Sequence, residues 1–582
     1  MKNKSERNLE KTVSRRFVFL SLFKSVIVGA IGWRLFDLQM VENQKYEKLS
    51  DDNQFDYHVV SPERGRILDR KMRLLAGNMD GFSLILNWKK NLDVEEVIKK
   101  ISGVININKK DLDSFYKEIK SIKINFSKKI LITKKLSQKD VSKLAVRSIE
   151  FPEISFFMSK KRVYPQGIIA GHLTGYIGKY SKSDSKSGLD IFVPGLNIGK
   201  RGLEKFFDTE LRGKFGRKRN EVTSKGHIID SQIYESTKPG KDIQVSLEMG
   251  LQAFALEKLE RGNNNLTSIK NKFIKRQIIE MDNIPLVNKN YVYTDKKNKI
   301  INPQSGSVIV MNIHNGEVLC SVSSPGFNPN IFSDGLEVDE WNKLKNNTRS
   351  PLLNRSMAGI YPPGSTIKMA VALAGLESGI IDYKDKFFCK GFKEIGDSNF
   401  HCWAKNGHGN LSLIEAIEQS CDVYFYELGL KVGIDRIASM LKKLGLGQYY
   451  DIEIDDKAKG VVPNIEWKLK RDGINWSLGE TLNASIGQGY ILATPLQLVT
   501  MVSRIVNSEF AINPTFMINN DKKNFEKLNI NKEHLKFIKK AMEKVVIGKN
   551  GTAKNYKIGS KKIEMAGKTG TVQVVRISQA ER

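Results

Sequence analysis

The sequence predicts an α+β protein of 582 residues with three parts: an N-terminal transmembrane helix, a mixed α/β pedestal without catalytic residues, and a catalytic domain whose antiparallel sheet is flanked by helices. Three observations predict these parts. An apolar stretch after a basic N-terminus predicts the helix, and the charged, periodic segments that follow predict the pedestal. A set of short motifs in the second half predicts the catalytic domain: Ser365-Thr-Ile-Lys368, Ser420-Cys-Asp422 and Lys568-Thr-Gly570. The expected boundaries are 1–14 (tail), 15–38 (anchor), 39–240 (pedestal) and 241–582 (catalytic domain).

The N-terminal segment predicts a membrane anchor. An apolar stretch from Phe17 to Trp33 follows six basic residues: Lys2, Lys4, Arg7, Lys11, Arg15 and Arg16. The stretch is close to the roughly 17-residue lower limit for a spanning helix. Basic flanks stay in the cytoplasm, so the N-terminus is expected there and the rest of the chain outside. A cleaved signal peptide is the alternative, but no clear small-x-small cleavage site follows.

Elements of the pedestal and of the catalytic domain follow from local patterns. Charged, periodic residues from Asp93 to Lys143 indicate helices and short strands. Residues 247–259 predict a helix, and residues 305–324 predict two antiparallel strands joined at Asn315-Gly316, a type I′ hairpin signal. Residues 262–304 are rich in Asn, Lys and Ile, and we expect them to form an inserted surface loop.

The first motif predicts a reactive serine. A Pro-Pro-Gly turn precedes Ser365, and an Ala- and Leu-rich helical run continues to Gly379. Ser365 is therefore expected at the N-terminus of a buried helix, where free N–H groups favour negative charge. Lys368 lies one turn further on the same face, and a lysine in an apolar pocket can be neutral and accept the serine proton. The alternative is a helix N-cap followed by a solvated lysine.

The second and third motifs predict polar groups beside this serine. Ser420 and Asp422 are expected in a loop between two helices, facing a cleft; a polar turn is the alternative. Small and β-branched residues from Met565 to Val575 predict a strand whose glycines let a substrate backbone approach. Its cation and hydroxyls, on Lys568, Thr569 and Thr571, suit a substrate carboxylate. An exposed basic edge strand is the alternative.

Three of the four cysteines and one histidine lie near the second motif and form a candidate metal site: Cys389, Cys402, His408 and Cys421. A Cys3His set is a common closed tetrahedral zinc site. Because Cys421 is the middle residue of the second motif, the metal would fix the loop that carries Ser420 and would be structural. A disulfide between two of the three cysteines is the alternative. Cys320 is expected to be a buried packing residue.

Together the three motifs resemble the signature of penicillin-binding proteins and serine β-lactamases. The chain is similar over nearly its whole length to class B penicillin-binding proteins of the rod-elongation type. Asp422, where most of the wider family has Asn, fits the elongation branch. The other matching motifs are Arg64-Gly-Arg-Ile-Leu-Asp-Arg70, Arg162-Val-Tyr-Pro-Gln-Gly167, Gly171-His-Leu-Thr-Gly-Tyr-Ile-Gly178, Gly202-Leu-Glu204, Leu211-Arg-Gly213, Ser305-Gly-Ser-Val-Ile-Val-Met311, Gly316-Glu-Val-Leu319 and Gly487-Gln-Gly489.

The resemblance implies a penicillin-binding, β-lactamase-like transpeptidase domain that crosslinks peptidoglycan during elongation and maintains rod shape. Ser365 would attack the penultimate D-alanine carbonyl of a stem peptide and form an acyl-enzyme, and β-lactams would trap it. Lys368 would be the general base, and Ser420 would pass the proton between the two lysines. The remaining implied roles concern substrate binding. Lys568 and Thr569 would hold the terminal carboxylate, and the backbone N–H groups of Ser365 and Thr571 would form the oxyanion hole. Asp422 and Gly570 are the last residues of the second and third motifs.

The resemblance also implies a place in the cell. It predicts a single-pass protein of the bacterial inner membrane with a periplasmic catalytic domain and a dimerisation-type pedestal. Expected partners are a polytopic lipid-II glycosyltransferase and elongation-complex proteins. D-Ala-D-Ala carboxypeptidase activity belongs to the same chemistry. Two alternatives stay open: a β-lactamase or β-lactam sensor, and an inactive scaffold.

The C-terminus departs from the family pattern. The chain stops at Arg582, 12 residues after Gly570, whereas similar enzymes continue with two strands and a helix. Those strands lie beside the Lys568 strand, which we therefore expect to be poorly supported. This predicts a fragment of a longer product or a truncated copy. A complete five-stranded sheet would contradict the prediction.

Charge gives no evidence for a nucleic-acid partner. The net charge is +30 and the isoelectric point is near 9.6. However, lysine, asparagine and isoleucine are frequent along the whole chain, and no basic stripe with interleaved aromatic residues stands out. We therefore expect no nucleic-acid binding.

Overall fold

The computed structural model has two compact units, which we describe one at a time. The first contains residues 1–63 and 213–240, and the second contains residues 64–212 and 241–582. The residues that the structure describes are 4–42, 55–88, 92–121, 128–180, 197–222, 228–261, 293–294, 300–301, 305–333, 336, 338–518, 525–560 and 562–573.

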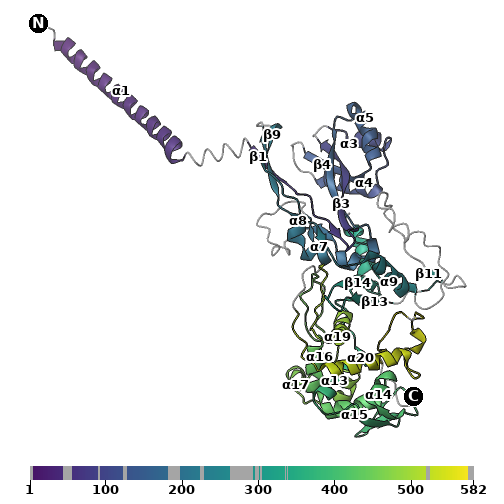
Figure 1. The fold of residues 1–582 in the computed structure, drawn as a ribbon. Coiled ribbons are helices and arrows are strands. Elements are labelled where there is room, and N and C mark those ends of the chain that lie inside the picture. Colours follow the sequence, from purple (N-terminus) through teal and green to yellow (C-terminus); the bar gives the residue numbers. More distant parts are fainter. Residues whose placement is uncertain are drawn as a thin grey trace. The chain divides into compact units, whose positions relative to one another are not determined.

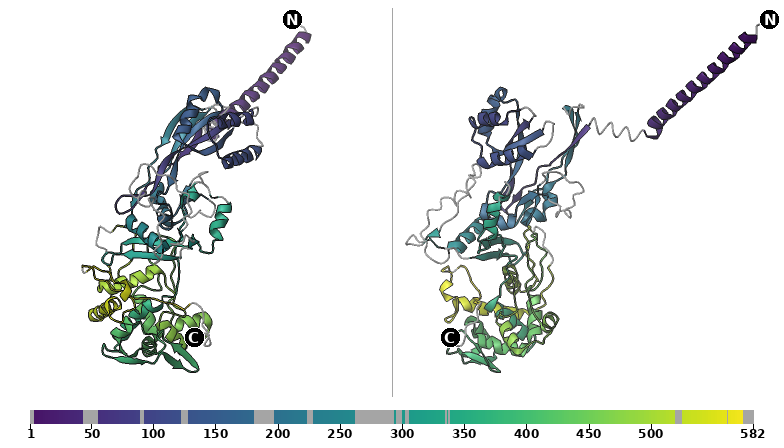
Figure 2. Two further views of the ribbon diagram at one scale, coloured as in Figure 1. Left: turned by 90° about the vertical axis from the view of Figure 1, so that its right-hand side faces the viewer. Right: turned by 180° about the vertical axis from the view of Figure 1, so that it is seen from behind.

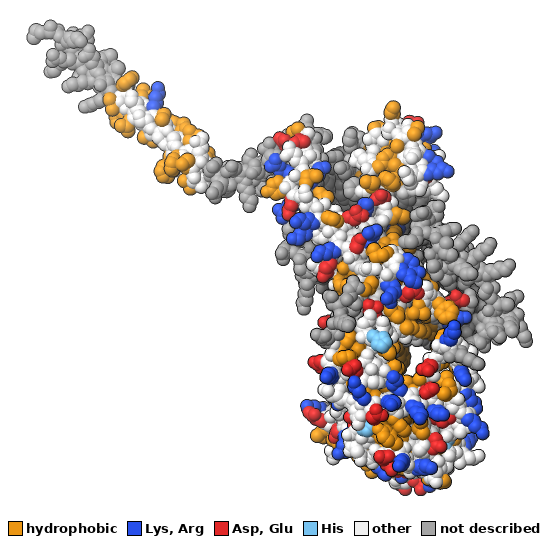
Figure 3. Space-filling model, in the orientation of Figure 1, with side chains coloured by type: hydrophobic (Ala, Val, Ile, Leu, Met, Phe, Trp, Pro, Cys, Tyr) orange, Lys and Arg blue, Asp and Glu red, His pale blue; other side chains and the backbone are white. Residues whose placement is uncertain are grey.

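The first unit begins with a long helix that is apolar from Phe17 onward. Helix α1 (Lys4–Phe36) continues as a π turn, Asp37–Val41. Its segment Phe17–Val41 has a mean hydropathy of 1.6 and is not buried against the rest of the protein. Apolar side chains cover the coloured part of this helix in Figure 3. By length and composition α1 can cross a membrane, which agrees with the predicted anchor.

The rest of the first unit is a small antiparallel sheet. Its strands are β1 (Phe55–Val60), β8 (Gly216–Val222) and β9 (Ile228–Glu235), in the order β1-β8-β9. Strand β8 therefore pairs on both sides, with Phe55 opposite Glu221 on one side and Ile228 opposite Val222 on the other.

The pedestal part of the second unit contains a five-stranded sheet covered by helices. Strands β10 (Ile243–Gln244), β2 (Ile67–Leu68), β3 (Leu74–Trp88) and β4 (Lys128–Leu136) follow one another, and β5 (Ile154–Val163) also pairs with β3. Helices α3 (Val94–Ser102), α4 (Lys109–Ser121) and α5 (Gln138–Val146) supply apolar side chains that form one core with β3 and β4. The prediction of helices and short strands between residues 93 and 143 is confirmed.

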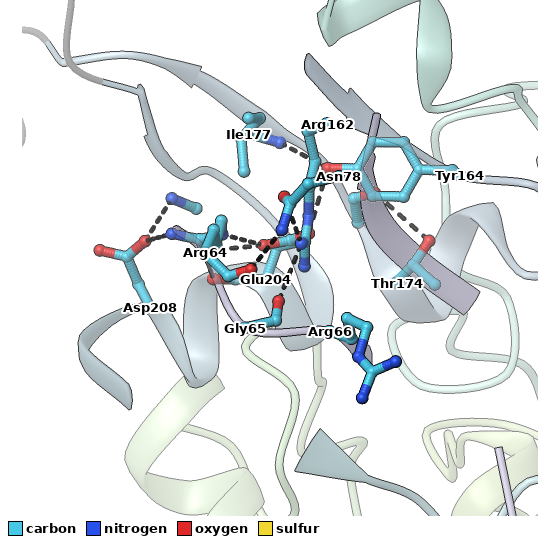
Figure 4. A network of polar contacts seen from close by, with 12 residues as sticks. Arg64, Gly65, Arg66, Asn78, Arg162, Tyr164, Thr174, Ile177, Glu204 and Asp208 are labelled. Atoms are coloured by element: carbon cyan, nitrogen blue, oxygen red, sulfur yellow. Dashed lines mark hydrogen bonds and ion pairs between the residues drawn. The ribbon is translucent and has the colours of Figure 1, made fainter. Parts of the chain in front are cut away.

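A buried ionic network connects three of the sequence motifs in the pedestal (Figure 4). The carboxylate of Glu204, on α7 (Gly202–Phe206), accepts from Arg64 Nε at 2.7 Å and from Arg162 Nε at 2.6 Å. Arg64 also pairs with Asp208, at the start of α8 (Asp208–Arg212), and Tyr164 donates to Glu204. Burial would raise the Glu204 pKa, but the two guanidinium groups outweigh it and hold the pKa below its ordinary value. Nearby short elements are α6 (Gly171–Thr174), β6 (Ile177–Lys179) and β7 (Asn197–Gly199).

The catalytic part of the second unit consists of a β-hairpin and a group of helices. The hairpin strands are β13 (Gly306–Met311) and β14 (Val318–Ser324), with α9 against β14 and α19 against β13. The helices are α9 (Met249–Arg261), α11 (Asn330–Ser333), α12 (Val338–Lys345), α13 (Lys368–Glu377), α14 (Leu413–Glu418), α15 (Asp422–Val432), α16 (Ile434–Lys443), α17 (Ile465–Asp472), α18 (Leu478–Ser485), α19 (Pro495–Asn507) and α20 (Lys532–Ile547).

Helix α13 lies at the centre of this group. It packs against α15, α16 and α20, and the green and yellow helices lie together in all views of Figures 1 and 2. The predicted helix near residues 247–259 and the predicted hairpin are confirmed, and Cys320 is buried as expected. Two further pairs of short strands are β15 (Lys386–Cys389) with β18 (Gly409–Ser412) and β16 (Phe392–Ile395) with β17 (Ser398–His401).

Two local predictions are wrong. The hairpin turn is not type I′: it is longer, Gly316 N donates to Asn312 O, and Gly316 but not Asn315 has a positive φ. The Lys568 segment is not a strand, because residues 562–573 pair with no strand among the described residues. Within the described residues the Lys568 segment thus lacks a neighbouring strand, which agrees with the expected poor support. That the chain is a fragment or a truncated copy stays a prediction.

The predicted insertion at residues 262–304 lies largely outside the described residues. Within it the structure describes only β11 (Tyr293–Thr294) and β12 (Ile300–Ile301), which pair antiparallel.

Candidate active site

Ser365 lies in a tight turn that leads into α13. Residues Gly364–Ile367 form a 3₁₀ turn, and the α-helix begins at Lys368. Gly364 has φ +57°, and its N–H donates to the carbonyl of Gly487 at 2.9 Å. A Cβ atom at position 487 would lie 2.1 Å from Gly364 O, so the Gly-Gln-Gly motif is needed for this close approach. Ser365 is partly exposed, and its hydroxyl has no hydrogen-bond partner in the described part of the chain.

Lys368 is fully buried but not in an apolar pocket. Its Nζ lies 2.7 Å from Asp422 Oδ1, 2.9 Å from the carbonyl of Ser420 and 3.4 Å from the Ser420 hydroxyl. The Asp422 carboxylate, which is partly buried, forms an ion pair with this amine. The expectation of an apolar environment for Lys368 is therefore wrong, because Asp422 comes from 54 residues further along the chain.

Ser420 connects the two lysines of the motifs. It lies between α14 and α15 with φ +53°, a left-handed conformation that is rare for a residue other than glycine. Its Oγ accepts from Lys568 Nζ at 2.8 Å and faces Lys368 Nζ at 3.4 Å. The structure thus brings Ser420, Asp422, Lys368 and Lys568 into one polar cluster.

The Lys568 segment lies against the turn that carries Ser365. A Cβ atom at Gly570 would lie 2.8 Å from Thr366 Cγ2, and one at Gly364 would lie 2.8 Å from Thr571 O. Gly567 N donates to Met542 O on α20 at 3.0 Å, which holds the segment in place of a neighbouring strand.

The electrostatics of the cluster act mainly on Lys568. Burial, followed by the nearby Lys368 amine, lowers the Lys568 pKa to about 7, although Asp422 opposes this effect. Near neutral pH, the Lys568 amine is therefore close to the midpoint of its titration.

The four predicted metal ligands come together beside this cluster. The ligand atoms of Cys389, Cys402, His408 and Cys421 all lie within 4.8 Å of one another. His408 Nδ1 is 3.6 Å from the sulfurs of both Cys389 and Cys402, and all four cysteines of the chain are free. A hydrogen bond from the Cys421 thiol lowers the pKa of Cys402. The same hydrogen bond, together with burial, raises the pKa of Cys421.

This donor set fits a tetrahedral metal better than a disulfide. Three sulfurs and one ring nitrogen converge on one point, which a bond between two sulfurs does not explain. Cys421 also ends the turn at Ser420, since its sulfur accepts from Tyr424 N at the start of α15. A metal held here would therefore fix the position of the second motif.

Two further residues of the site were not predicted from the sequence. Trp403 donates its indole N–H to the carbonyls of Gln419, at 3.1 Å, and Ser420, at 3.2 Å. The Thr552 hydroxyl lies 2.8 Å from that of Thr569. Neither residue belongs to a short motif, and both contacts join distant segments, so no local pattern indicated them.

Comparisons with known proteins agree with this geometry. Residues 306–581 match the family described as penicillin binding protein transpeptidase domain, and residues 59–245 match the penicillin-binding protein dimerisation domain. The peptidoglycan D,D-transpeptidase MrdA of Acinetobacter baumannii is 29% identical over 98% of this chain and 80% of that relative. MrdA of Escherichia coli strain K12 is 27% identical over 97% of this chain and 85% of that relative.

Solved structures give the same result. A complex between penicillin-binding protein PBP2 and MreC from Helicobacter pylori has a TM-score of 0.72 and 31% identity, covering 89% of this chain and 90% of that chain. The predicted fold class and transpeptidase activity are confirmed, and a β-lactamase, sensor or scaffold is not favoured. The chain belongs to the class B penicillin-binding proteins of the PBP2/MrdA type, the serine D,D-transpeptidases of peptidoglycan synthesis.

Proposed function

We propose that this transpeptidase acts during cell elongation and carries its acyl group on Ser365. The observation that supports this assignment most strongly is the polar cluster in which Ser420 contacts both lysine amines beside the Ser365 turn. Ser365 Oγ would attack the penultimate D-alanine carbonyl. Its proton would pass through Lys368 and Ser420 to the amine of the terminal D-alanine, which departs as the amide bond breaks. An amine of a second stem peptide would then take the acyl group.

The third motif would bind the end of the substrate. Lys568 and Thr569 would hold the terminal carboxylate, and the N–H groups of Ser365 and Thr571 would bind the oxyanion. The contact between the 364 turn and the 570 segment supports this, because it places Thr571 beside the turn that carries Ser365. Removing one such donor typically costs about 100- to 1000-fold in rate.

The test of this function is labelling of the full-length protein in membranes with a fluorescent penicillin, followed by a chase with unlabelled drug. We expect the label to persist through the chase, since a transpeptidase deacylates slowly. Rapid loss with release of hydrolysed penicillin would identify a β-lactamase, and no labelling would identify a scaffold.

The charge of Lys568 gives a pH prediction. An amine that holds a carboxylate must be protonated, and the free enzyme loses this proton as the pH rises through about 7. We expect the second-order rate constant for acylation by penicillin to fall about 10-fold or more across that range, since a hydrogen bond to a charged group contributes about 1.5–3 kcal/mol.

Lys568→Arg is the matched variant, because a guanidinium stays charged at every accessible pH. Its acylation rate constant is expected to lack the fall near pH 7. A wild-type rate that rises through pH 7 would instead make Lys568 a base and would contradict the carboxylate role.

We also propose a structural zinc ion held by Cys389, Cys402, His408 and Cys421. The convergence of the four ligand atoms and the free state of the cysteines support it. The ion would supply no Lewis acid chemistry; its ligands would hold the Ser420 turn.

Elemental analysis of the purified chain is expected to give about one zinc per protein, and Cys402→Ser should lose most of it. Cys320→Ser is the matched control, since Cys320 lies in a different hydrophobic core from the three ligand cysteines and should leave the zinc content unchanged. Two missing thiols in a thiol titration of the unfolded, metal-free chain would indicate a disulfide instead.

The membrane setting completes the proposal. The apolar helix and the MrdA relatives support a single-pass anchor. We infer a cytoplasmic N-terminus, the bacterial inner membrane and a periplasmic catalytic domain from the basic residues before α1. The MreC complex of the Helicobacter pylori relative supports elongation-complex partners, and we infer a lipid-II glycosyltransferase among them.

A further inference from the structure

Trp403 is an exposed residue that nevertheless contacts two residues of the catalytic cluster, Ser420 and Asp422. Its side chain is 61% exposed, but its indole N–H is shared between the carbonyls of Gln419 and Ser420. Its backbone N–H donates to Asp422 Oδ2 at 3.2 Å. The ring also lies edge-on against His408, with centroids 5.1 Å apart.

The acceptors of these bonds are the groups that determine where the Ser420 hydroxyl lies. The Ser420 carbonyl accepts from Trp403 Nε1 and also from Lys368 Nζ at 2.9 Å. The Asp422 carboxylate also accepts from both residues: Oδ1 accepts from Lys368 Nζ, and Oδ2 accepts from the Trp403 backbone N–H. Each acceptor next to the catalytic lysine is thus held from the other side by Trp403.

Ser420 needs such support because of its backbone conformation. At φ +53° a residue with a Cβ is strained by roughly 1–2 kcal/mol. Within the turn, Ser420 N donates to Ile417 O, and Cys421 N, which lies in the same peptide plane as the Ser420 carbonyl, donates to Ala416 O. Trp403 Nε1 holds the carbonyl end of that plane. If the peptide rotated, the carbonyl would leave Lys368 and the hydroxyl would move relative to Lys568.

We propose that Trp403 is a positioning residue for acyl transfer: its indole N–H holds the Ser420 carbonyl on Lys368 and thereby keeps the Ser420 hydroxyl between the two lysine amines. This inference rests on the proposed roles of Ser420 and Lys368. It assigns to the Trp403 indole N–H a function in the acylation step, which is separate from the packing of the ring against His408.

The test replaces only the indole N–H. Trp403→Phe keeps an aromatic ring against His408, and incorporation of benzothienylalanine at position 403 keeps the bicyclic shape with sulfur in place of N–H. For both variants of the full-length protein we expect the first-order acylation rate constant with penicillin to fall about 10-fold, the equivalent of one hydrogen bond of about 1.4 kcal/mol. The dissociation constant of the initial complex, the zinc content and the melting temperature are expected to stay unchanged.

Trp476→Phe is the matched control, since it removes another indole N–H of the same domain, which donates to Thr481 at 2.8 Å. Its acylation rate constant should stay at the wild-type value. An unchanged rate constant in the benzothienylalanine protein would overturn the inference, as would a loss that follows zinc content and melting temperature in parallel. Either result would leave the labelling of Ser365 intact, so it is distinguishable from a failure of the proposed function.

Discussion

Replacing Ser365 by alanine is expected to abolish covalent labelling of the full-length protein by a fluorescent penicillin. The variant lacks the only atom that the proposed mechanism acylates, and losing a catalytic serine lowers the rate by roughly a million-fold in a serine hydrolase. The fold should persist, because the Ser365 hydroxyl has no hydrogen-bond partner in the described part of the chain. The measurement is fluorescence of the protein band after a fixed labelling time.

Ser378→Ala is the matched control for this experiment. Ser378 lies at the other end of α13, where its hydroxyl donates to Ala374 O, and it touches none of the three motifs. Its variant should label like the wild type. Labelling of Ser365→Ala at the wild-type rate would show that another residue is the nucleophile and would remove the basis for every other role assigned here.

Sequence reasoning succeeded where the information was local. The Pro-Pro-Gly turn and the Ala- and Leu-rich run that follows determine the start of α13, and the three-residue spacing places Lys368 one turn after Ser365. The break between α14 and α15 at Ser420 likewise follows from residues within the segment. Helices form from contacts between near neighbours, so their patterns are visible in a sequence.

The errors concern contacts between distant segments. A strand exists only when a partner supplies the other half of its hydrogen bonds, so the β-branched pattern after Lys568 did not suffice to make one. The ion pair between Lys368 and Asp422 and the indole contact of Trp403 with Ser420 join separate elements. Each motif was visible by itself, but the charge environment of Lys368 was not.

The pedestal shows the same distinction. The motifs containing Arg64, Arg162 and Glu204 were identified one by one, yet nothing in the sequence indicated that they form a single ionic network. Glu204 is completely buried and pairs with two guanidinium groups, so its negative charge compensates the burial of Arg162 and, together with Asp208, that of Arg64. Tyr164 is also part of the network. Its hydroxyl donates to Glu204 and accepts from Ile177 N, so Tyr164 connects the network to β6.

Glu204→Gln is therefore expected to destabilise the pedestal by about 3–5 kcal/mol, because it leaves the buried Arg162 without a counter-charge and Arg64 with Asp208 alone. Hydrogen exchange of the full-length protein should show loss of protection in peptides covering residues 64–78, 162–180 and 197–212. Asp242→Asn is the matched control: it breaks the exposed pair of Asp242 with Arg66, which contributes about 1 kcal/mol or less. The prediction depends on the Glu204 charge being buried and the Asp242 charge being exposed. An equal loss of protection in Glu204→Gln and Asp242→Asn would therefore contradict it.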